Sequence, residues 1–264
     1  MAVPGRRVKA IASLQAQRMA TPVPRGGLPA GGQVPLCVFC TRLHRCHISI
    51  LFSARRSAKD EQATEGIFMT DWNDRIRLVE TVELCRNWGK LDRNVFDYQR
   101  SDGSWQRQTR ETYDRGDGAA VLAYDPDRGT VLLTRQFRFS TWKRGYHEPL
   151  IEVCAGLLDA DDPASCIRKE AEEEMGVTIE APEFVFALFM SPGSVVERLH
   201  HFVARYRPEN RHSAGGGHVH EGEDIEVIEL PFEEALAMCR DGRIVDAKTV
   251  LLLQYAALNG LFAR

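Results

Sequence analysis

The pattern of hydrophobic and polar residues predicts an α/β protein after residue 69. Short apolar or alternating runs bounded by turn residues are typical of strands, and apolar residues at i, i+3 and i+4 are typical of helices. The runs predict strands at Val95–Tyr98, Trp105–Tyr113, Ala119–Tyr124, Thr130–Arg135, Leu150–Ala155, Phe184–Met190, His201–Tyr206 and Ile225–Leu230. The helical spacing predicts helices at Ala164–Met175, Phe232–Arg240 and Lys248–Leu258. Strands interleaved with helices in this order predict a mixed sheet flanked by helices.

Turn signals organise the first strands into antiparallel hairpins. Ser101–Ser104 has Asp-Gly at its centre, and Asp125–Gly129 separates the next two strands. The first hairpin, within residues 75–115, is not expected to be stable alone, because a lone hairpin buries too little surface. The strand Leu150–Ala155 is predicted to run directly into a turn at Gly156.

Three carboxylates share one side of the predicted helix Ala164–Met175. Glu170, Glu173 and Glu174 are spaced i, i+3 and i+4, which places them on one face with no cation to partner them. Like charges at this spacing repel by roughly 0.2–0.5 kcal/mol per pair. A hard divalent cation such as Mg²⁺ would relieve that repulsion and share its remaining positions with substrate phosphates. The competing interpretation is a solvated acidic surface.

The residues around the acids favour the metal site. Pro163 suits a first helical turn, Asp161 and Asp162 suit the helix N-terminus, and Gly176 suits its end. The acids thus lie on one face of a helix that follows a buried strand and a turn. This arrangement favours a binding site over an isolated acidic surface.

The segment Lys169–Val177 resembles the second half of the Nudix box, with Lys169 where the family has Arg. The first half departs from the family pattern. Counting back from Glu170 puts Ala155 at the family's Gly and Asp161 at its Glu, whereas anchoring on Gly156 offers Asp162 instead. Whether Asp161 or Asp162 corresponds to the first Glu of the family pattern, and its role, are therefore left open. The match of the predicted metal-binding helix does not depend on this choice.

The resemblance extends from about Trp72 to Leu261 and is to the GDP-mannose pyrophosphatase (NudK) branch of the Nudix hydrolases. The stretches that carry it are Thr112–Ala119, Arg135–Arg138, Cys154–Asp159, Met190–Gly193, Ala214–Gly217, Glu223–Val227 and Asp246–Leu253. The resemblance implies a Nudix α/β/α sandwich with a mixed sheet, preceded by a small antiparallel β region that forms a homodimer. We expect a disordered or spurious extension at 1–68, dimerisation strands at 69–115 and the Nudix domain at 116–264.

The resemblance also implies site residues. The Mg²⁺ ligands would be the backbone carbonyl of Ala155 and the carboxylates of Glu170, Glu174 and Glu223. Glu223 is the expected base; Glu173 lies close behind the ligands, and Lys169 would orient the acids or be a solvated charge. The substrate would contact Trp88, Arg110, Glu111, Arg138, Ala155, Gly156, Leu157, Glu174, Glu197, Gly222, Glu223 and Lys248. Trp88 would stack on the base or be a buried strand residue, and His212, His218 and His220 are expected to face solvent.

The implied reaction is Mg²⁺-dependent hydrolysis of a nucleoside diphosphate sugar, GDP-mannose to GMP and mannose 1-phosphate. Two alternatives stay open: an ADP-ribose or ADP-sugar pyrophosphatase, and a Nudix-like module that senses a nucleotide without hydrolysing it. The repulsive acidic helix argues against the sensor, because a pure binder has little use for a metal site.

Composition and charge limit which binding partners and which cellular compartment are expected for this chain. Residues 1–59 hold ten Lys and Arg side chains and no acid, so the rest holds 24 basic against 37 acidic side chains, net −13. Such an acidic body is a poor nucleic-acid binder. No apolar run reaches the roughly 20 residues of a membrane span. Seven scattered cysteines indicate a reducing compartment, the cytoplasm.

The N-terminal segment allows three interpretations. Its Arg-rich, acid-poor composition is typical of a transit peptide. The cluster Cys37, Cys40, His44, Cys46 and His47 has spacings that could bind zinc, but it lacks the second half of a zinc finger. The preferred interpretation is that translation begins at Met69.

Overall fold

The computed structural model describes residues 71–179 and 181–263, and it confirms the predicted α/β fold. The predictions for residues 1–68, including the cysteine and histidine cluster, lie outside the described residues. A three-stranded sheet comprises β1 (Ile76–Arg86), β2 (Lys90–Gln99) and β3 (Trp105–Asp114). A seven-stranded sheet comprises β4 (Gly118–Asp125), β5 (Thr130–Gln136), β6 (Leu150–Glu152), β7 (Cys154–Leu157), β8 (Glu183–Phe189), β9 (Arg198–Arg205) and β10 (Glu226–Pro231).

Four helices accompany the larger sheet in the described part of the chain. They are the short α1 (Phe139–Trp142), then α2 (Pro163–Met175), α3 (Phe232–Asp241) and α4 (Ala247–Leu258). None of the described helices is long and apolar enough to cross a bilayer. Strand order is β10-β5-β4-β9-β8, with β6 paired to β5 and β7 paired to β4. The sheet is mixed because β4 and β9 are parallel, whereas the other pairs are antiparallel.

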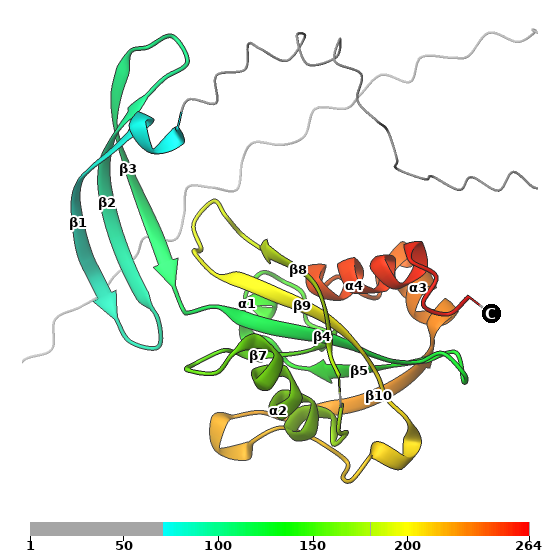
Figure 1. The fold of residues 1–264 in the computed structure, drawn as a ribbon. Helices are drawn as coiled ribbons and strands as arrows, with labels where there is room; N and C mark the ends of the chain where they lie inside the picture. Colours follow the sequence, from blue (N-terminus) through cyan, green and yellow to red (C-terminus); the bar gives the residue numbers. More distant parts are fainter. Residues whose placement is uncertain (1–70, 180, 264) are drawn as a thin grey trace, which may run out of the picture. The chain divides into compact units, whose positions relative to one another are not determined.

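Alternating side chains on the central strands build a core on each face of this sheet. Leu122 and Leu133 pack with Leu252 of α4, whereas the neighbouring Val121 and Leu132 pack with Ile167 of α2. Burying a side chain of this size contributes about 1.5–3 kcal/mol. Figure 1 shows α2 on one face of the sheet and α3 and α4 on the other, which is an α/β/α sandwich.

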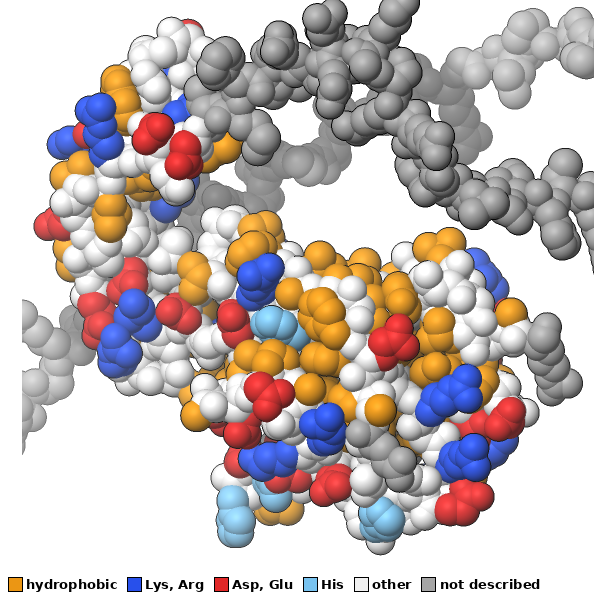
Figure 2. All heavy atoms as spheres, viewed as in Figure 1, with side chains coloured by type: hydrophobic (Ala, Val, Ile, Leu, Met, Phe, Trp, Pro, Cys, Tyr) orange, Lys and Arg blue, Asp and Glu red, His pale blue; other side chains and the backbone are white. Residues whose placement is uncertain are grey.

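The three-stranded sheet is accompanied by the short 3-10 helix η2 (Trp72–Arg75), which contacts β1 and β2. Its strands are antiparallel, with β2 in the centre. Most side chains of β1 and β3 are exposed. Figure 2 shows hydrophobic side chains between charged ones on its surface. Backbone hydrogen bonds connect the end of β3 to the larger domain, because Tyr113 donates to Ser194 O at 2.7 Å and accepts from Val196 N at 3.1 Å.

Two local predictions were wrong. The predicted hairpin before residue 115 is a three-stranded sheet, because β1 was missed. Two register shifts interrupt β1, between Leu78 and Glu80 and between Glu83 and Cys85, and they break the period-two pattern that identifies a strand. The predicted turn at Gly156 is part of strand β7, which pairs with β4.

Candidate active site

Helix α2 begins and ends at residues suited to those positions. One carboxylate oxygen of Asp162 accepts hydrogen bonds from the amides of Ala164 and Ser165, each at 3.1 Å. Pro163 occupies the first turn, where its missing N–H would have no helical partner. Gly176 follows the last turn with φ of 67°, a conformation that glycine adopts without strain. The helix ends therefore follow from local sequence.

The carboxylates of Glu170 and Glu174 lie against strand β7. Ala155 donates its backbone N–H to Oε2 of Glu174 at 3.3 Å. Gly156 lies so close to the helix that an added Cβ would overlap the carboxylate of Glu170. Glu174 is only 2% exposed, and Glu170 is partly buried. The packing of α2 on β7 thus holds two acids together at the edge of the core.

Burial raises the pKa of both carboxyl groups. Loss of hydration raises the pKa of Glu170 to about 7, and the charges of Glu173 and Glu223 add to this effect. Burial likewise raises the pKa of Glu174 to about 7; a hydrogen bond with Cys154 opposes the shift, and the charge of Glu170 adds to it. Among the described residues, no Lys, Arg or His forms an ion pair with Glu170 or Glu174. A buried acid and a partly buried acid that repel each other are suited to share a hard cation, which binds through carboxylate oxygens.

This set of donors fits a divalent metal ion. Carboxylate and backbone carbonyl oxygens are the ligands that Mg²⁺ prefers, and Ala155 adjoins the two acids. Glu223 is the third predicted acid, and its charge acts on both Glu170 and Glu174. No three His, Cys, Asp or Glu side chains in residues 71–179 and 181–263 converge closely enough to hold a metal ion. Glu170 and Glu174 therefore lie together against β7, whereas Glu223, on a separate loop, does not complete a three-residue cluster with them among the described residues.

The loop that carries Glu223 is attached to the end of α2. Gly216 donates its backbone N–H to Glu174 O at 3.0 Å, and Gly217 donates to Glu173 O at 3.1 Å. These bonds satisfy carbonyls that the last helical turn leaves without helical partners. Both glycines have positive φ, 122° and 73°, which allows the chain to turn tightly there.

His212, His218 and His220 are all exposed, as expected. Two of them also have partners, and Nε2 of His218 lies 3.0 Å from Oε1 of Glu173. The hydrogen bond and negative charge of Glu173 raise the pKa of His218. The backbone N–H of His218 donates to Oε2 of Glu223 at 2.8 Å. His212 also has a partner, because its Nε2 lies 2.9 Å from the hydroxyl of Thr178.

A buried carboxylate that sequence reasoning missed connects Arg138 and Lys248. Glu152 is 2% exposed, accepts from Nε of Arg138 at 2.7 Å and is paired with Nζ of Lys248. Asp246 also accepts from Lys248, at 3.0 Å. Burial favours the neutral form of Glu152, but the charges of Lys248 and Arg138 outweigh burial and lower its pKa. The position of Glu152 in the middle of an otherwise apolar strand was the sequence feature that could have identified it.

A second group of predicted substrate residues meets near Arg115. Trp88 is 84% exposed, so it is not a buried strand residue. The guanidinium carbon of Arg115 lies 5.9 Å from the centroid of its ring. Nε of Arg115 lies 3.4 Å from Oε1 of Glu197. No local sequence pattern pointed to Arg115, whose contacts with Trp88 and Glu197 are tertiary.

The remaining predicted residues lie apart from this group. Arg110 and Glu111 lie on β3, and the Arg110 side chain donates to Thr109 O and Gln108 Oε1 of the same strand. Lys169 is largely exposed, with Nζ 4.0 Å from Glu173. Leu157 ends β7, and Gly222 has φ of 77° just before Glu223.

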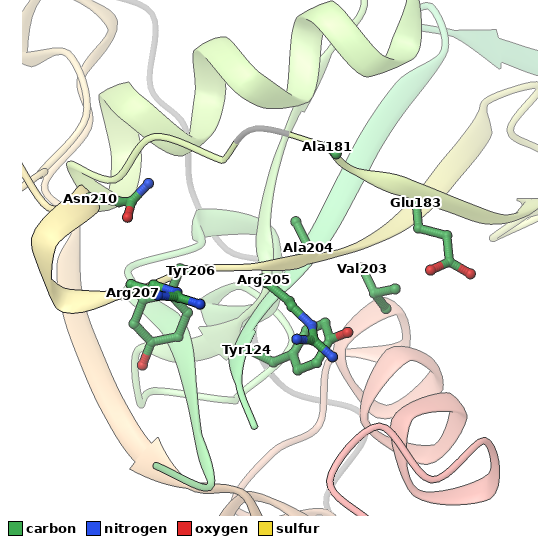
Figure 3. Close-up of a pocket in the computed structure, with 9 residues that line it drawn as sticks. All are labelled: Tyr124, Ala181, Glu183, Val203, Ala204, Arg205, Tyr206, Arg207 and Asn210. Carbon is green, nitrogen blue, oxygen red and sulfur yellow. The ribbon is translucent and has the colours of Figure 1, made fainter. Parts of the chain in front are cut away.

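A surface hollow of about 510 Å³ contains none of the predicted residues. It lies at the C-terminal ends of β4 and β9, where Tyr124 and Arg205 adjoin Glu183 of β8 (Figure 3). The acids of α2 instead adjoin the first half of β4, because Ala155 pairs with Ala120. The chemistry that the acids can support is therefore at the other end of β4.

Comparison with known families covers most of the described chain. Residues 75–113 match the GDP-mannose pyrophosphatase NudK N-terminal domain, and residues 114–253 match the NUDIX domain. The boundary between the two matches falls at the junction between β3 and β4.

Curated relatives match over nearly their whole length. A GDP-mannose pyrophosphatase of Pectobacterium atrosepticum is 52% identical over 190 residues, 72% of this chain and 97% of the relative. A protein of the same name from Klebsiella pneumoniae is 49% identical over 189 residues, 71% of this chain and 94% of the relative. One from Cronobacter sakazakii is 50% identical over 187 residues, which cover 70% of this chain and 97% of the relative. With these relatives and a domain match over more than half of its length, the chain belongs to the NUDIX family.

Proposed function

We propose that this chain is a Nudix pyrophosphatase that hydrolyses GDP-mannose to GMP and mannose 1-phosphate. One water is added as a P–O bond of the diphosphate breaks. The relatives at about 50% identity carry the name of this activity. The structural observation that supports hydrolysis is the pair of acids at β7, Glu174 buried and Glu170 partly buried, with no ion-pair partner among the described residues.

Hydrolases of this family use a divalent metal ion. The proposed ion is Mg²⁺, held by the carbonyl of Ala155 and the carboxylates of Glu170, Glu174 and Glu223. When bound, it neutralises the charge of the diphosphate. Glu223 is the proposed base that would take the proton of the attacking water; its loop is hydrogen-bonded to the end of α2, and its charge acts on Glu170 and Glu174. Glu173 lies close behind the proposed metal ligands, and Lys169 is proposed to orient the acids of α2.

Arg138 and Lys248 are suited to hold the phosphates or the sugar. Glu152 binds both cations, and Asp246 also binds Lys248; one N–H group of each cation forms no hydrogen bond with the described residues and could donate to substrate. Backbone groups of Ala155, Gly156 and Leu157 would contact the diphosphate. Trp88, Arg110, Glu111, Glu197 and Gly222 complete the proposed substrate site.

The chain is proposed to act as a homodimer through its three-stranded sheet. Five large side chains of this sheet and of η2 before it, Trp72, Ile76, Leu78, Val79 and Leu84, are 44–67% exposed. Exposed apolar groups of this density are typical of an interaction surface. A second copy of the chain would cover them.

The proposed location is the cytoplasm, and it rests on cysteine usage. The described cysteines, Cys85, Cys154, Cys166 and Cys239, are free thiols. Free, dispersed thiols are typical of a reducing compartment.

Hydrolysis is tested with the full chain, Mg²⁺ and a panel of GDP-mannose, GDP-glucose, ADP-ribose, ADP-glucose and UDP-glucose. Products are separated by chromatography. We expect preferential release of GMP from GDP-mannose. Glu174→Gln should lower kcat more than about 100-fold. Even residues that only hydrogen-bond to metal ligands cost about 10–100-fold in activity or metal affinity when they are mutated, and Glu174 is a proposed ligand itself. Glu172→Gln, on the exposed side of α2, is the matched control and should retain activity.

The other outcomes identify the alternatives. Preferential release of AMP would place the substrate among ADP-ribose and ADP-sugars. Tight binding of one nucleotide with no turnover by the unmodified chain would contradict the enzyme proposal.

A further inference from the structure

The tip of the loop before β10 is organised around one residue, His218. Its backbone carbonyl accepts from the amides of Glu221 at 2.9 Å and Glu223 at 3.2 Å. Its backbone N–H donates to Oε2 of Glu223 at 2.8 Å. Its imidazole Nε2 lies 3.0 Å from Oε1 of Glu173 on α2. A single residue therefore contacts both the carboxylate of the loop and the helix that carries the other acids.

The base of the loop is held by different contacts. Gly216 and Gly217 donate backbone N–H groups to α2, and Ile225 donates to Gly216 O at 3.2 Å. Of the side chains in residues 218–223, that of His218 contacts α2, through its hydrogen bond with Glu173. Without the imidazole, the base would stay attached while the tip would lose its connection to the helix.

The position of the Glu223 carboxylate depends on this tip. The side chain covers Gly217, where an added Cβ would overlap its Oε2. Its carboxylate accepts from the His218 amide, so the place of His218 sets the place of Glu223. The charge of Glu223 acts on Glu170 and Glu174, which puts the three acids in one electrostatic group.

We infer that His218 is a positioning residue, whose imidazole anchors the loop tip to Glu173 so that its backbone holds Glu223 beside the acids of α2. This inference rests on the proposed function, in which Glu223 acts on the water and the metal ion. The His218 side chain is 50% exposed, so the contact contributes modestly to folding. Its effect is expected on the placement of Glu223.

The test compares His218→Ala, His218→Gln and His220→Ala in the full chain. His220 is the matched control because it is an exposed imidazole in the same tip with no hydrogen bond or ion pair among the described contacts. We expect His218→Ala to lower kcat for GDP-mannose about 3- to 10-fold with KM within about 2-fold, which corresponds to the energy of one such contact. His218→Gln retains a side-chain donor and should recover part of the loss.

Mn²⁺ binding without substrate gives a second, independent measurement. Free Mn²⁺ is counted by electron paramagnetic resonance, and His218→Ala should weaken its binding by a factor similar to the loss in kcat. If His218→Ala matches His220→Ala in both kcat and Mn²⁺ affinity, the inference is wrong. If the unmodified chain hydrolyses no nucleotide sugar, the proposed function fails, and the Mn²⁺ comparison still decides the role of His218.

Discussion

Glu152 is a carboxylate within an apolar strand, and cations occupy both of its oxygens. Oε1 accepts from Arg138, and Oε2 is paired with Lys248, which is 96 residues away in sequence. Removing the charge of this buried acid would leave Arg138 without its described ion-pair partner and Lys248 with Asp246 alone, which is more costly than losing a surface pair. This carboxylate therefore stabilises the fold and positions two residues of the proposed substrate site.

Glu152→Gln should lower the free energy of unfolding by about 3 kcal/mol, measured by urea denaturation at pH 7. This is the low end of the range for a broken buried pair, because the Arg138 side chain is 41% exposed and keeps contact with water. Glu226→Gln is the matched control, since Glu226 pairs with Arg135 on the exposed surface of the same sheet and should cost less than about 1 kcal/mol. Equal losses in the two variants would contradict the prediction.

The same residue predicts a dependence of stability on pH. The pKa of Glu152 is lower in the folded protein than the ordinary value of about 4.3, so its contribution is complete above that value. It is lost as the pH falls through the lower pKa of the folded state. The difference in unfolding free energy between the unmodified chain and Glu152→Gln should therefore be constant near neutral pH and shrink below about pH 4. A difference independent of pH down to pH 2 would show that Glu152 is not held by its cations.

At the scale of elements, the candidate active site depends on the close approach of β7 and α2. Gly156 permits this approach because it lacks a side chain, and not because of an unusual backbone conformation. The sequence located α2 from its periodicity and end signals. It placed Gly156 in a turn, since a single sequence does not reveal that β7 pairs with β4.

Gly156→Ala should lower kcat about 100-fold, because its Cβ would displace the carboxylate of Glu170 and a displacement of about 1 Å can cost that much. Gly193→Ala, whose Cβ would enter open space, is the control and should remain active. Both variants are checked by steady-state kinetics and by thermal unfolding. Full activity of Gly156→Ala would mean that the position of Glu170 does not limit the reaction.

At the scale of the whole molecule, the three-stranded sheet exposes apolar side chains that the described chain does not cover. Sheets of this size are marginal without a packed face. The match of residues 75–113 to a separate N-terminal domain agrees with a distinct role for this sheet. The homodimer stays a prediction until it is measured.

Light scattering of the full chain at micromolar concentration should give twice the 29.7 kDa mass of one chain. Leu78→Glu places a charge among the exposed apolar side chains and should shift the protein toward the monomer. Glu172→Gln, on α2, should leave the mass unchanged. A single monomeric mass for the unmodified chain would contradict the homodimer.

The sequence by itself determined the features that depend on neighbours along the chain. Proline, aspartate and glycine set the ends of α2, and the i, i+3, i+4 spacing placed its three acids on one face, because helical geometry is local. The order of matching motifs identified the NUDIX family, which the comparisons confirm. Only the tertiary structure decided that Glu152 joins Arg138 to Lys248 and that His218 contacts Glu173. Those contacts depend on strand register and loop docking, which bring together residues that no local pattern relates.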